Sequence, residues 1–175
     1  MKRTVALVGM MGAGKSSVGR RLAARLGVPF RDADSEIEAA AGCTIAEIFD
    51  RFGEQDFRDG ERRVIARLLG QPPHVLATGG GAFIDPRTRA EIKAQAVSIW
   101  LRASIELLTG RVQRRDTRPL LRQGDPKEIL TRLLAEREPI YAEADIQLDS
   151  EEGPHAAVVE RIIAALGERG LLERA

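Results

Sequence analysis

The residues best suited to chemistry lie near the start of the chain, where residues 9–16 read GMMGAGKS. They match the phosphate-loop pattern GxxxxGK[ST] at every specified position, between an apolar run of strand length and a helical repeat of apolar residues. Backbone N–H groups of such a loop, with the N-terminus of the following helix, bind phosphate oxygens. Lys15 would reach the outer phosphates, and the Ser16 hydroxyl is placed to ligate Mg²⁺. The loop therefore predicts a nucleotide-binding site.

Two carboxylates follow the next apolar stretch. We expect a second strand at residues 28–32, ending in Asp32, with Asp34 two residues further on. Because side chains alternate along a strand, both carboxylates can share one face where the strand gives way to a helix. They could hold Mg²⁺ through water and accept hydrogen bonds from a substrate hydroxyl. The alternative is that Asp34 caps the helix, with Glu36 and Glu38 in its first turn. Beside a phosphate loop we favour the functional interpretation.

Three further places in the sequence could contribute to a ligand-binding site. Arg58 and Glu61 are three residues apart in an expected helix and can pair, most simply as a surface ion pair. Residues 79–81 are all glycine and follow an expected strand, where they let backbone N–H groups approach a ligand or form a tight turn. Arg137 lies four residues beyond Leu133 and extends the apolar face of its helix, so it needs an anionic partner.

The segment at residues 110–124 is rich in arginine. It also contains Thr117, Pro119 and a glycine at each end, which interrupt regular structure. This composition predicts a mobile cationic lid. A solvated helix face and a nucleic-acid patch are the alternatives, but the aromatic residues on which bases stack are missing from the segment. Its arginines are Arg111, Arg114, Arg115, Arg118 and Arg122.

The elements that must position these residues alternate between strand and helix. Strands are expected at residues 4–8, 28–32, 74–78, 97–101 and 144–148. Helices are expected after the phosphate loop, at 45–52, from Phe57 onward, at 86–94, at 125–137 and at 154–166. This alternation predicts a single α/β domain with a parallel sheet covered by helices on both faces.

Composition narrows the class of protein. The 175 residues suit one domain, and 43% hydrophobic with 30% charged residues is typical of a globular protein. No apolar run approaches the roughly 20 residues of a membrane span. The N-terminus leaves no room for a secretory signal, so a cytoplasmic protein is expected. A net charge of +1 gives no general attraction to nucleic acid, and Cys43, the only cysteine, can form no internal disulfide.

Six short stretches stand in the same order as the motifs of one enzyme family. They are GMMGAGKS at 9–16, FRDAD at 30–34, FRDGE at 57–61, GGG at 79–81, RPLL at 118–121 and REPIY at 137–141. From end to end the chain resembles the shikimate kinase family. The resemblance implies ATP-dependent phosphorylation of the 3-hydroxyl of shikimate, giving shikimate 3-phosphate and ADP on the route to chorismate and the aromatic amino acids.

The same resemblance implies the fold of nucleoside-monophosphate kinases. This is an α/β fold with a five-stranded parallel sheet in the order 2-3-1-4-5, flanked by helices, here in a single domain at residues 1–175. Substrate-binding helices would lie at residues 34–62 and the lid at 110–124. The implied partners are ATP with Mg²⁺ and shikimate, without nucleic acid or membrane, and we expect a monomer.

The resemblance also implies roles for individual residues. Lys15 and Arg118 would stabilise the phosphoryl group in transfer, and Asp34 would orient the accepting hydroxyl or act as its base. Ser16 would ligate Mg²⁺ directly, and Asp32 would bind the ion through one of its waters. The residues implied at the ATP site are Gly12, Ala13, Gly14, Lys15, Ser16, Ser17, Arg111 near adenine and Arg118. Those implied at the shikimate site are Asp34, Arg58, Glu61, Gly79, Gly80, Gly81 and Arg137, with Glu61 orienting Arg58.

Other functions remain compatible with parts of the sequence. The nearest is another small-molecule kinase of the same fold, such as a gluconate kinase, because Arg58 and Arg137 favour an acidic acceptor without choosing one. A nonenzymatic nucleotide- or nucleic-acid-binding module is the second. A GTPase is excluded because the chain contains no asparagine, so the guanine-reading NKxD motif cannot exist.

One stretch departs from the family pattern. Family members often place a basic residue beside adenine just before the last helix, whereas residues 151–155 here are EEGPH. The residues that contact adenine there are therefore left unassigned.

Overall fold

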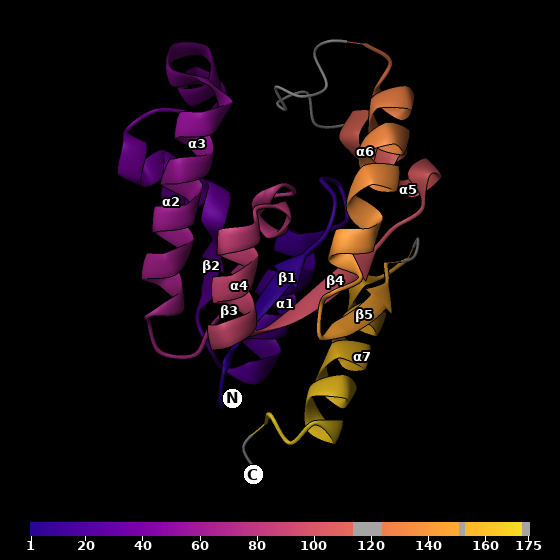
Figure 1. Cartoon of the computed structure of the whole chain (residues 1–175). Helices are drawn as coiled ribbons and strands as arrows, with labels where there is room; N and C mark the ends of the chain where they lie inside the picture. The colour runs from indigo at the N-terminus through magenta and orange to yellow at the C-terminus, as the bar shows by residue number, and fades with distance from the viewer. Residues whose placement is uncertain (114–123, 151–152, 173–175) are drawn as a thin grey trace.

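A five-stranded parallel sheet in the order β2-β3-β1-β4-β5 forms the centre of the protein (Figure 1). The computed structural model describes residues 1–113, 124–150 and 153–172. The strands are β1 (Thr4–Val8), β2 (Phe30–Asp32), β3 (Val75–Ala77), β4 (Ala96–Arg102) and β5 (Ile146–Asp149). The predicted fold class, strand order and parallel pairing are confirmed.

Strand β1 lies in the middle of the sheet and is covered on both faces. All five of its residues are buried, and Val5 lies opposite Val75 of β3 on one side and Val97 of β4 on the other. A parallel strand covered on both faces must be apolar at successive positions, not at alternate ones. The apolar run that precedes the phosphate loop meets this requirement, so the loop is held at the carboxyl end of the central strand.

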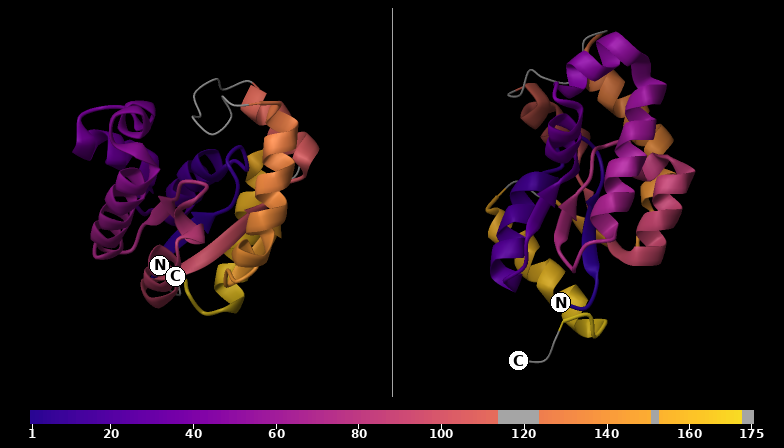
Figure 2. Two further views of the ribbon diagram at one scale, coloured as in Figure 1. Left: turned by 45° about the horizontal axis from the view of Figure 1, so that its top comes forward. Right: turned by 90° about the vertical axis from the view of Figure 1, so that its left-hand side faces the viewer.

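Helices cover both faces of the sheet. Right-handed crossovers place α1, which follows β1, on one face and α4, which follows β3, on the other. Helix α1 packs on α7, and α4 packs on β4 and α3. In Figures 1 and 2, α2 and α3 lie on one side of the carboxyl edge of the sheet, and α5 and α6 lie on the other. None of the described helices is long and apolar enough to cross a lipid bilayer. The helices are α1 (Lys15–Leu26), α2 (Ala33–Ala41), α3 (Ile45–Leu69), the 3-10 turn η1 (Ala82–Ile84), α4 (Pro86–Gln95), α5 (Ile105–Gln113), α6 (Pro126–Tyr141) and α7 (His155–Glu168).

Helix α3 joins the two helices that were expected at residues 45–52 and from Phe57 onward. Its start is capped by Thr44, whose side chain accepts the N–H of Glu47, while the Glu47 carboxylate accepts the N–H of Thr44. At Gly53, φ is 81° and ψ is 174°, a backbone conformation almost restricted to glycine. The helix is therefore kinked at Gly53, between its capped first segment and the segment that carries Arg58.

Two strands begin two residues later than expected because neighbouring groups form hydrogen bonds with the residues before them. Strand β2 starts at Phe30 because the N–H of Val28 donates to the carbonyl of Ala23 and closes helix α1. Strand β5 starts at Ile146, after Asp145 has formed a local network with β4. The Asp145 carboxylate accepts from the N–H and hydroxyl of Ser98 at 2.8 and 2.7 Å, and the Asp145 N–H donates back to that hydroxyl.

The end of α6 and the predicted lid also differ from the sequence expectations. Helix α6 continues to Tyr141, beyond the expected end at residue 137, because Pro139 lies late in the helix and removes only one N–H. Residues 110–113 of the predicted lid form the last turn of α5, a helix that was not anticipated. Residues 114–123, with Arg118, lie outside the described residues.

Candidate active site

The phosphate loop joins β1 to α1. Gly14 precedes the first turn of α1 with a φ of 93°, in the left-handed region that favours glycine. The first N–H groups of a helix have no partner within it, so this terminus can bind an anion. Lys15 is 7% exposed, and its Nζ donates to the carbonyls of Gly9 and Met10 at 2.7 and 2.8 Å. The ammonium group is therefore held inside the loop that the sequence pattern assigns to phosphates.

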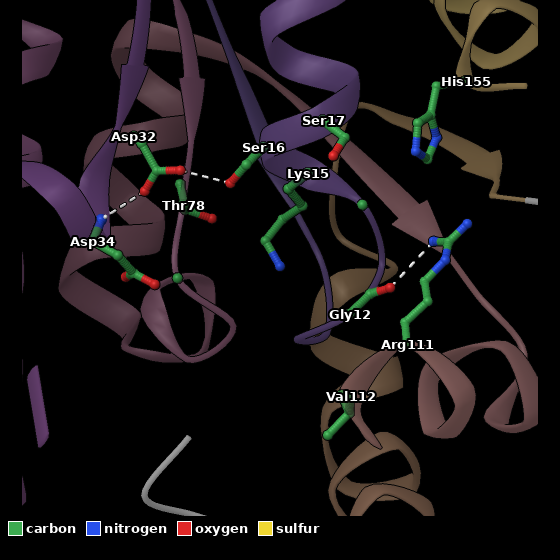
Figure 3. A pocket seen from close by; sticks show the side chains of 12 residues that line it. Gly12, Lys15, Ser16, Ser17, Asp32, Asp34, Thr78, Arg111, Val112 and His155 are labelled. Carbon is green, nitrogen blue, oxygen red and sulfur yellow. Dashed lines mark hydrogen bonds between the residues drawn. The ribbon is translucent and has the colours of Figure 1, made fainter. Parts of the chain in front are cut away.

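Asp32 connects the phosphate loop with the start of α2. Its Oδ2 accepts from the hydroxyl of Ser16 at 2.6 Å, and its Oδ1 accepts from the backbone N–H of Asp34 at 3.1 Å (Figure 3). The same Oδ1 accepts from the backbone N–H of Ser35 at 3.4 Å. Asp32 is therefore the cap of α2, and the alternative that Asp34 caps this helix is wrong. Asp34 lies in the first turn of α2, so strand alternation does not relate the two carboxylates, yet both line one pocket.

A pocket of about 260 Å³ lies at the carboxyl edge of the sheet (Figure 3). It brings together most of the described residues that were predicted for the ATP site, along with Asp34 and Gly79 from the predicted shikimate site. Ala13 does not line it, because this residue is buried and its carbonyl accepts from the Ser150 hydroxyl at 3.0 Å. The lining residues are Gly12, Gly14, Lys15, Ser16, Ser17, Asp32, Asp34, Thr78, Gly79, Arg111, Val112 and His155.

The glycines that follow β3 make room for charged side chains. A Cβ built on Gly79 would lie 2.9 Å from both Asp34 Oδ1 and Glu61 Oε2. A Cβ built on Gly81 would lie 2.6 Å from Cζ of Arg58. Neither position can hold a larger residue without displacing one of these groups. The site residues Arg58 and Glu61, which lie outside the pocket described above, are thereby brought against the same loop as Asp34.

Arg58 and Glu61 form a largely buried pair, not the surface ion pair that their spacing most simply suggests. Arg58 Nη1 donates to Glu61 Oε1 at 2.7 Å, and Glu61 is only 1% exposed. Burial raises the pKa of the Glu61 carboxyl above its ordinary value, against the opposing pull of the Arg58 guanidinium. Because the buried Glu61 carboxylate accepts this hydrogen bond, it holds the Arg58 guanidinium beside Gly81.

Arg137 reaches the same loop from α6. It is 9% exposed, which confirms its predicted inward position, and its Nη1 lies 3.7 Å from the point where a Cβ of Gly80 would stand. This nitrogen is buried and has no hydrogen-bond partner within the described residues, and the same holds for Oε2 of Glu61. A buried charged group without a partner costs free energy. The arrangement is therefore suited to an incoming group that can accept hydrogen bonds from Arg137.

Arg111 and His155 line the part of the pocket beside the phosphate loop. Arg111 Nη1 donates to the carbonyl of Gly12 at 3.1 Å and to the hydroxyl of Ser150 at 3.4 Å. His155, the first residue of α7, was not among the predicted site residues because it belongs to no motif. Its one sequence signal was its position at the start of the last helix. Burial lowers the pKa of His155, as do the charges of Arg111 and Arg21, so its imidazole is neutral near pH 7.

This chain is similar to known proteins in both sequence and structure. The family model for shikimate kinase matches residues 11–167. A shikimate kinase of Caulobacter vibrioides is 61% identical over 164 residues, which cover 94% of this chain and 82% of that protein. The shikimate kinase from Acinetobacter baumannii in complex with shikimate has a TM-score of 0.94 and 38% identity, covering 97% of this chain and 95% of that one. A gluconokinase from Sinorhizobium meliloti has a TM-score of 0.65 at 20% identity, covering 95% of this chain and 93% of its own, which shows a shared fold alone.

Proposed function

This chain belongs to the shikimate kinase family and has shikimate kinase activity, and we propose that it transfers the γ-phosphoryl group of ATP to the 3-hydroxyl of shikimate at the carboxyl ends of β1 and β3. The observation that carries this proposal is the buried Arg137 guanidinium, whose Nη1 has no partner within the described residues and lies beside Gly80. It favours an anionic acceptor next to the phosphate loop.

The acceptor is held by the charged groups around the glycines. Arg58 and Arg137 bind the carboxylate of shikimate, because a guanidinium presents paired donors that match its two oxygens. Glu61 orients Arg58 through the 2.7 Å hydrogen bond. Asp34, which lies against Gly79 together with Glu61, orients the 3-hydroxyl and accepts its proton as the phosphoryl group transfers.

The residues near the phosphate loop fit Mg²⁺. The Ser16 hydroxyl would ligate the ion, and Asp32, whose Oδ2 lies 2.6 Å from that hydroxyl, would bind one of its waters. In the part of the chain that the structure describes, no group of three or more His, Cys, Asp or Glu side chains could hold a metal ion. Phosphate oxygens and water would complete the coordination that Mg²⁺ prefers. When bound, the ion neutralises charge on the phosphates, and Lys15 stabilises the group in transfer.

The nucleotide is proposed to extend from the phosphate loop toward Arg111 and His155, with Gly12, Gly14 and Ser17 lining its phosphates. Arg118 would act on the transferring group from the lid, a role that rests on the family resemblance because this residue lies outside the described ranges. We regard residues 1–175 as one domain, with substrate-binding helices at 34–62 and a lid at 110–124. We propose that the protein carries out this reaction as a monomer in the cytoplasm.

A coupled assay of ADP release tests the proposal, with shikimate, with gluconate and without an acceptor. Shikimate is expected to stimulate ADP release, and gluconate is not. Lys15→Ala is expected to fold but to lose nearly all turnover, because its charge acts on the phosphoryl group in transit. Lys93→Ala, which removes an exposed lysine, is the matched control and should retain turnover. Stimulation by gluconate would contradict the acceptor, and near-normal turnover of Lys15→Ala would contradict the role of the loop.

A further inference from the structure

Tyr141, the last residue of α6, has no role in the reaction described above. It is fully buried, and its ring centroid lies 5.8 Å from that of Trp100 on β4. Its hydroxyl donates to the carbonyl of Gly80 and lies 3.9 Å from Sδ of Met10. One side chain of α6 therefore contacts both the glycines at the acceptor site and the phosphate loop.

The two segments that Tyr141 contacts are packed directly against each other. A Cβ built on Gly80 would lie only 3.2 Å from the backbone nitrogen of Met11. The carbonyl of Met10 accepts from Nζ of Lys15 at 2.8 Å. Displacement of the Gly80 peptide would therefore disturb the acceptor side first and the phosphate loop next. The Tyr141 hydroxyl fixes this peptide from the direction of α6.

Arg137 lies one turn before Tyr141 on the same helix. Burial raises the pKa of the Tyr141 hydroxyl, and the nearby charge of Arg137 opposes this rise. The hydroxyl therefore stays protonated and donates a hydrogen bond to the carbonyl of Gly80. Between the two residues, Pro139 has no N–H, so the last turn of α6 lacks one backbone hydrogen bond. The Tyr141 side chain therefore anchors the last turn of α6, where one backbone hydrogen bond is missing, and Arg137 lies at this end of the helix.

We propose that Tyr141 is a positioning residue for the acceptor: its hydroxyl holds α6 on the Gly80 peptide and so aims the Arg137 guanidinium at the carboxylate of shikimate. It touches no reacting atom. This inference rests on the proposed function, because it requires that Arg137 binds the acceptor. The competing explanation is that the hydroxyl only satisfies a buried carbonyl and contributes to stability.

Tyr141→Phe tests the inference, because it removes one oxygen and keeps the ring packed on Trp100. The KM for shikimate is expected to rise about fivefold to tenfold, the effect of one lost buried hydrogen bond. The KM for ATP should stay within about twofold, and kcat should fall by less than the shikimate KM rises. The Kd for shikimate, measured by isothermal titration calorimetry, should follow its KM.

Ser98→Ala is the matched control for a buried hydroxyl outside the site. It removes the oxygen that binds Asp145 at 2.7 Å between β4 and β5. Both variants are expected to lower Tm, but Ser98→Ala should leave both KM values unchanged. The positioning role is wrong if Tyr141→Phe lowers only Tm, or if it raises the KM values for ATP and shikimate alike.

A double variant separates this inference from the proposed function. If Tyr141 acts through Arg137, Tyr141→Phe combined with Arg137→Lys should raise the shikimate KM by less than the product of the two single effects. Fully multiplicative effects would show that the two residues act independently and would overturn the inference alone. An unchanged shikimate KM in Arg137→Lys by itself would instead contradict the proposed function.

Discussion

Two arginines from different helices approach the same glycine loop. Arg58 of α3 lies against Gly81, and Arg137 of α6 lies beside Gly80. A guanidinium is planar and presents its donors in a fixed fork, whereas an ammonium is a compact charge on a flexible stem. If the proposed clamp is correct, shape matters here as much as charge, and a lysine cannot replace either arginine.

Each of the substitutions Arg58→Lys and Arg137→Lys is expected to lower kcat/KM for shikimate. The corresponding loss of transition-state stabilisation is about 2–4 kcal/mol, the range for disrupting a desolvated charged pair. The KM for ATP should hardly change, because neither residue lines the pocket beside the phosphate loop. Steady-state kinetics measure both. Arg63→Lys is the matched control, because Arg63 is an exposed arginine on α3.

The amide analogue of shikimate isolates the carboxylate in this test. It is uncharged and of similar shape, so it should be a poor substrate for the parent enzyme. On either arginine substitution it should lose much less kcat/KM than shikimate does. Equal losses for acid and amide would mean that the arginines are structural.

Gly81→Ala tests whether the glycine makes room for Arg58. The new Cβ would lie 2.6 Å from the guanidinium carbon, so the end of this side chain must move. Displacement by about 1 Å can cost about 100-fold in rate, so kcat/KM for shikimate should fall by up to that factor with little loss of Tm. Gly60→Ala on α3 is the control, because a Cβ there meets nothing within 4 Å, and it should stabilise the helix by about 0.5–1 kcal/mol. Unchanged kinetics in Gly81→Ala would contradict the geometric reason for the glycine.

The motifs predict which residues form the site better than they predict the structural role of each residue. Three consecutive glycines suggested close approach of backbone N–H groups to a ligand. The structure adds that Gly79 and Gly81 leave space for side chains of α2 and α3, which lie far away in the sequence. No local rule predicts such contacts. The same limit applies to His155, whose place beside the phosphate loop depends on how α7 packs on α1.

At the scale of elements, His74 attaches the start of β3 to β1. Its Nδ1 lies 2.9 Å from the carbonyl of Pro72, so this nitrogen carries a proton and donates. Its backbone N–H donates to the hydroxyl of Thr4 at 3.4 Å. Nε2 is buried and has no partner among the described residues. Burial lowers the pKa of His74 below its ordinary value of 6.5, so the imidazole is neutral in the folded protein near neutral pH.

The His74 environment predicts a loss of stability in mild acid. Below pH 6.5 the unfolded chain binds a proton at this histidine before the folded protein does, so the free energy of unfolding falls as pH falls. The contribution is complete above pH 6.5 and is lost as pH drops through the lower folded pKa. One such proton contributes a slope of at most about 1.4 kcal/mol per pH unit. Denaturant unfolding at a series of pH values measures this slope.

His74→Gln should reduce the slope by that contribution, because its amide can donate to Pro72 without titrating. The variant is expected to be less stable than the parent at pH 7 and to lose less stability on acidification. Parallel pH profiles for parent and variant would contradict the assignment to His74.

Elements with strong local signals were predictable. Thr44 followed three residues later by Glu47 is a capping pattern visible in the sequence, and the structure has this cap. The break at Gly53 agrees with the two helices expected there. Element ends were less predictable. Asp32, not Asp34, caps α2, and its second carboxylate oxygen accepts from Ser16, which is 16 residues away in the sequence. A capping rule that considers only neighbours cannot distinguish the two aspartates.

At the scale of the whole molecule, strand order places the two halves of the site side by side. Strands β1 and β3 are neighbours, but the helices that follow them leave to opposite faces, which opens a crevice at their carboxyl ends. The phosphate loop follows β1, and the glycines follow β3. The alternation of strands and helices predicted the parallel sheet, whereas the strand order came from the family resemblance. Helix α5, which carries Arg111, was not anticipated from either.

Trp100 is the only tryptophan of the chain. Its ring packs on Tyr141, and its Cδ1 would lie 3.2 Å from a Cβ on Gly9, at the start of the phosphate loop. The indole therefore borders the nucleotide side and the acceptor side of the site together. Indole emission changes with the charges and contacts around the ring. Binding of nucleotide or of acceptor is therefore expected to change the emission of this one indole, which a titration can record without an attached dye.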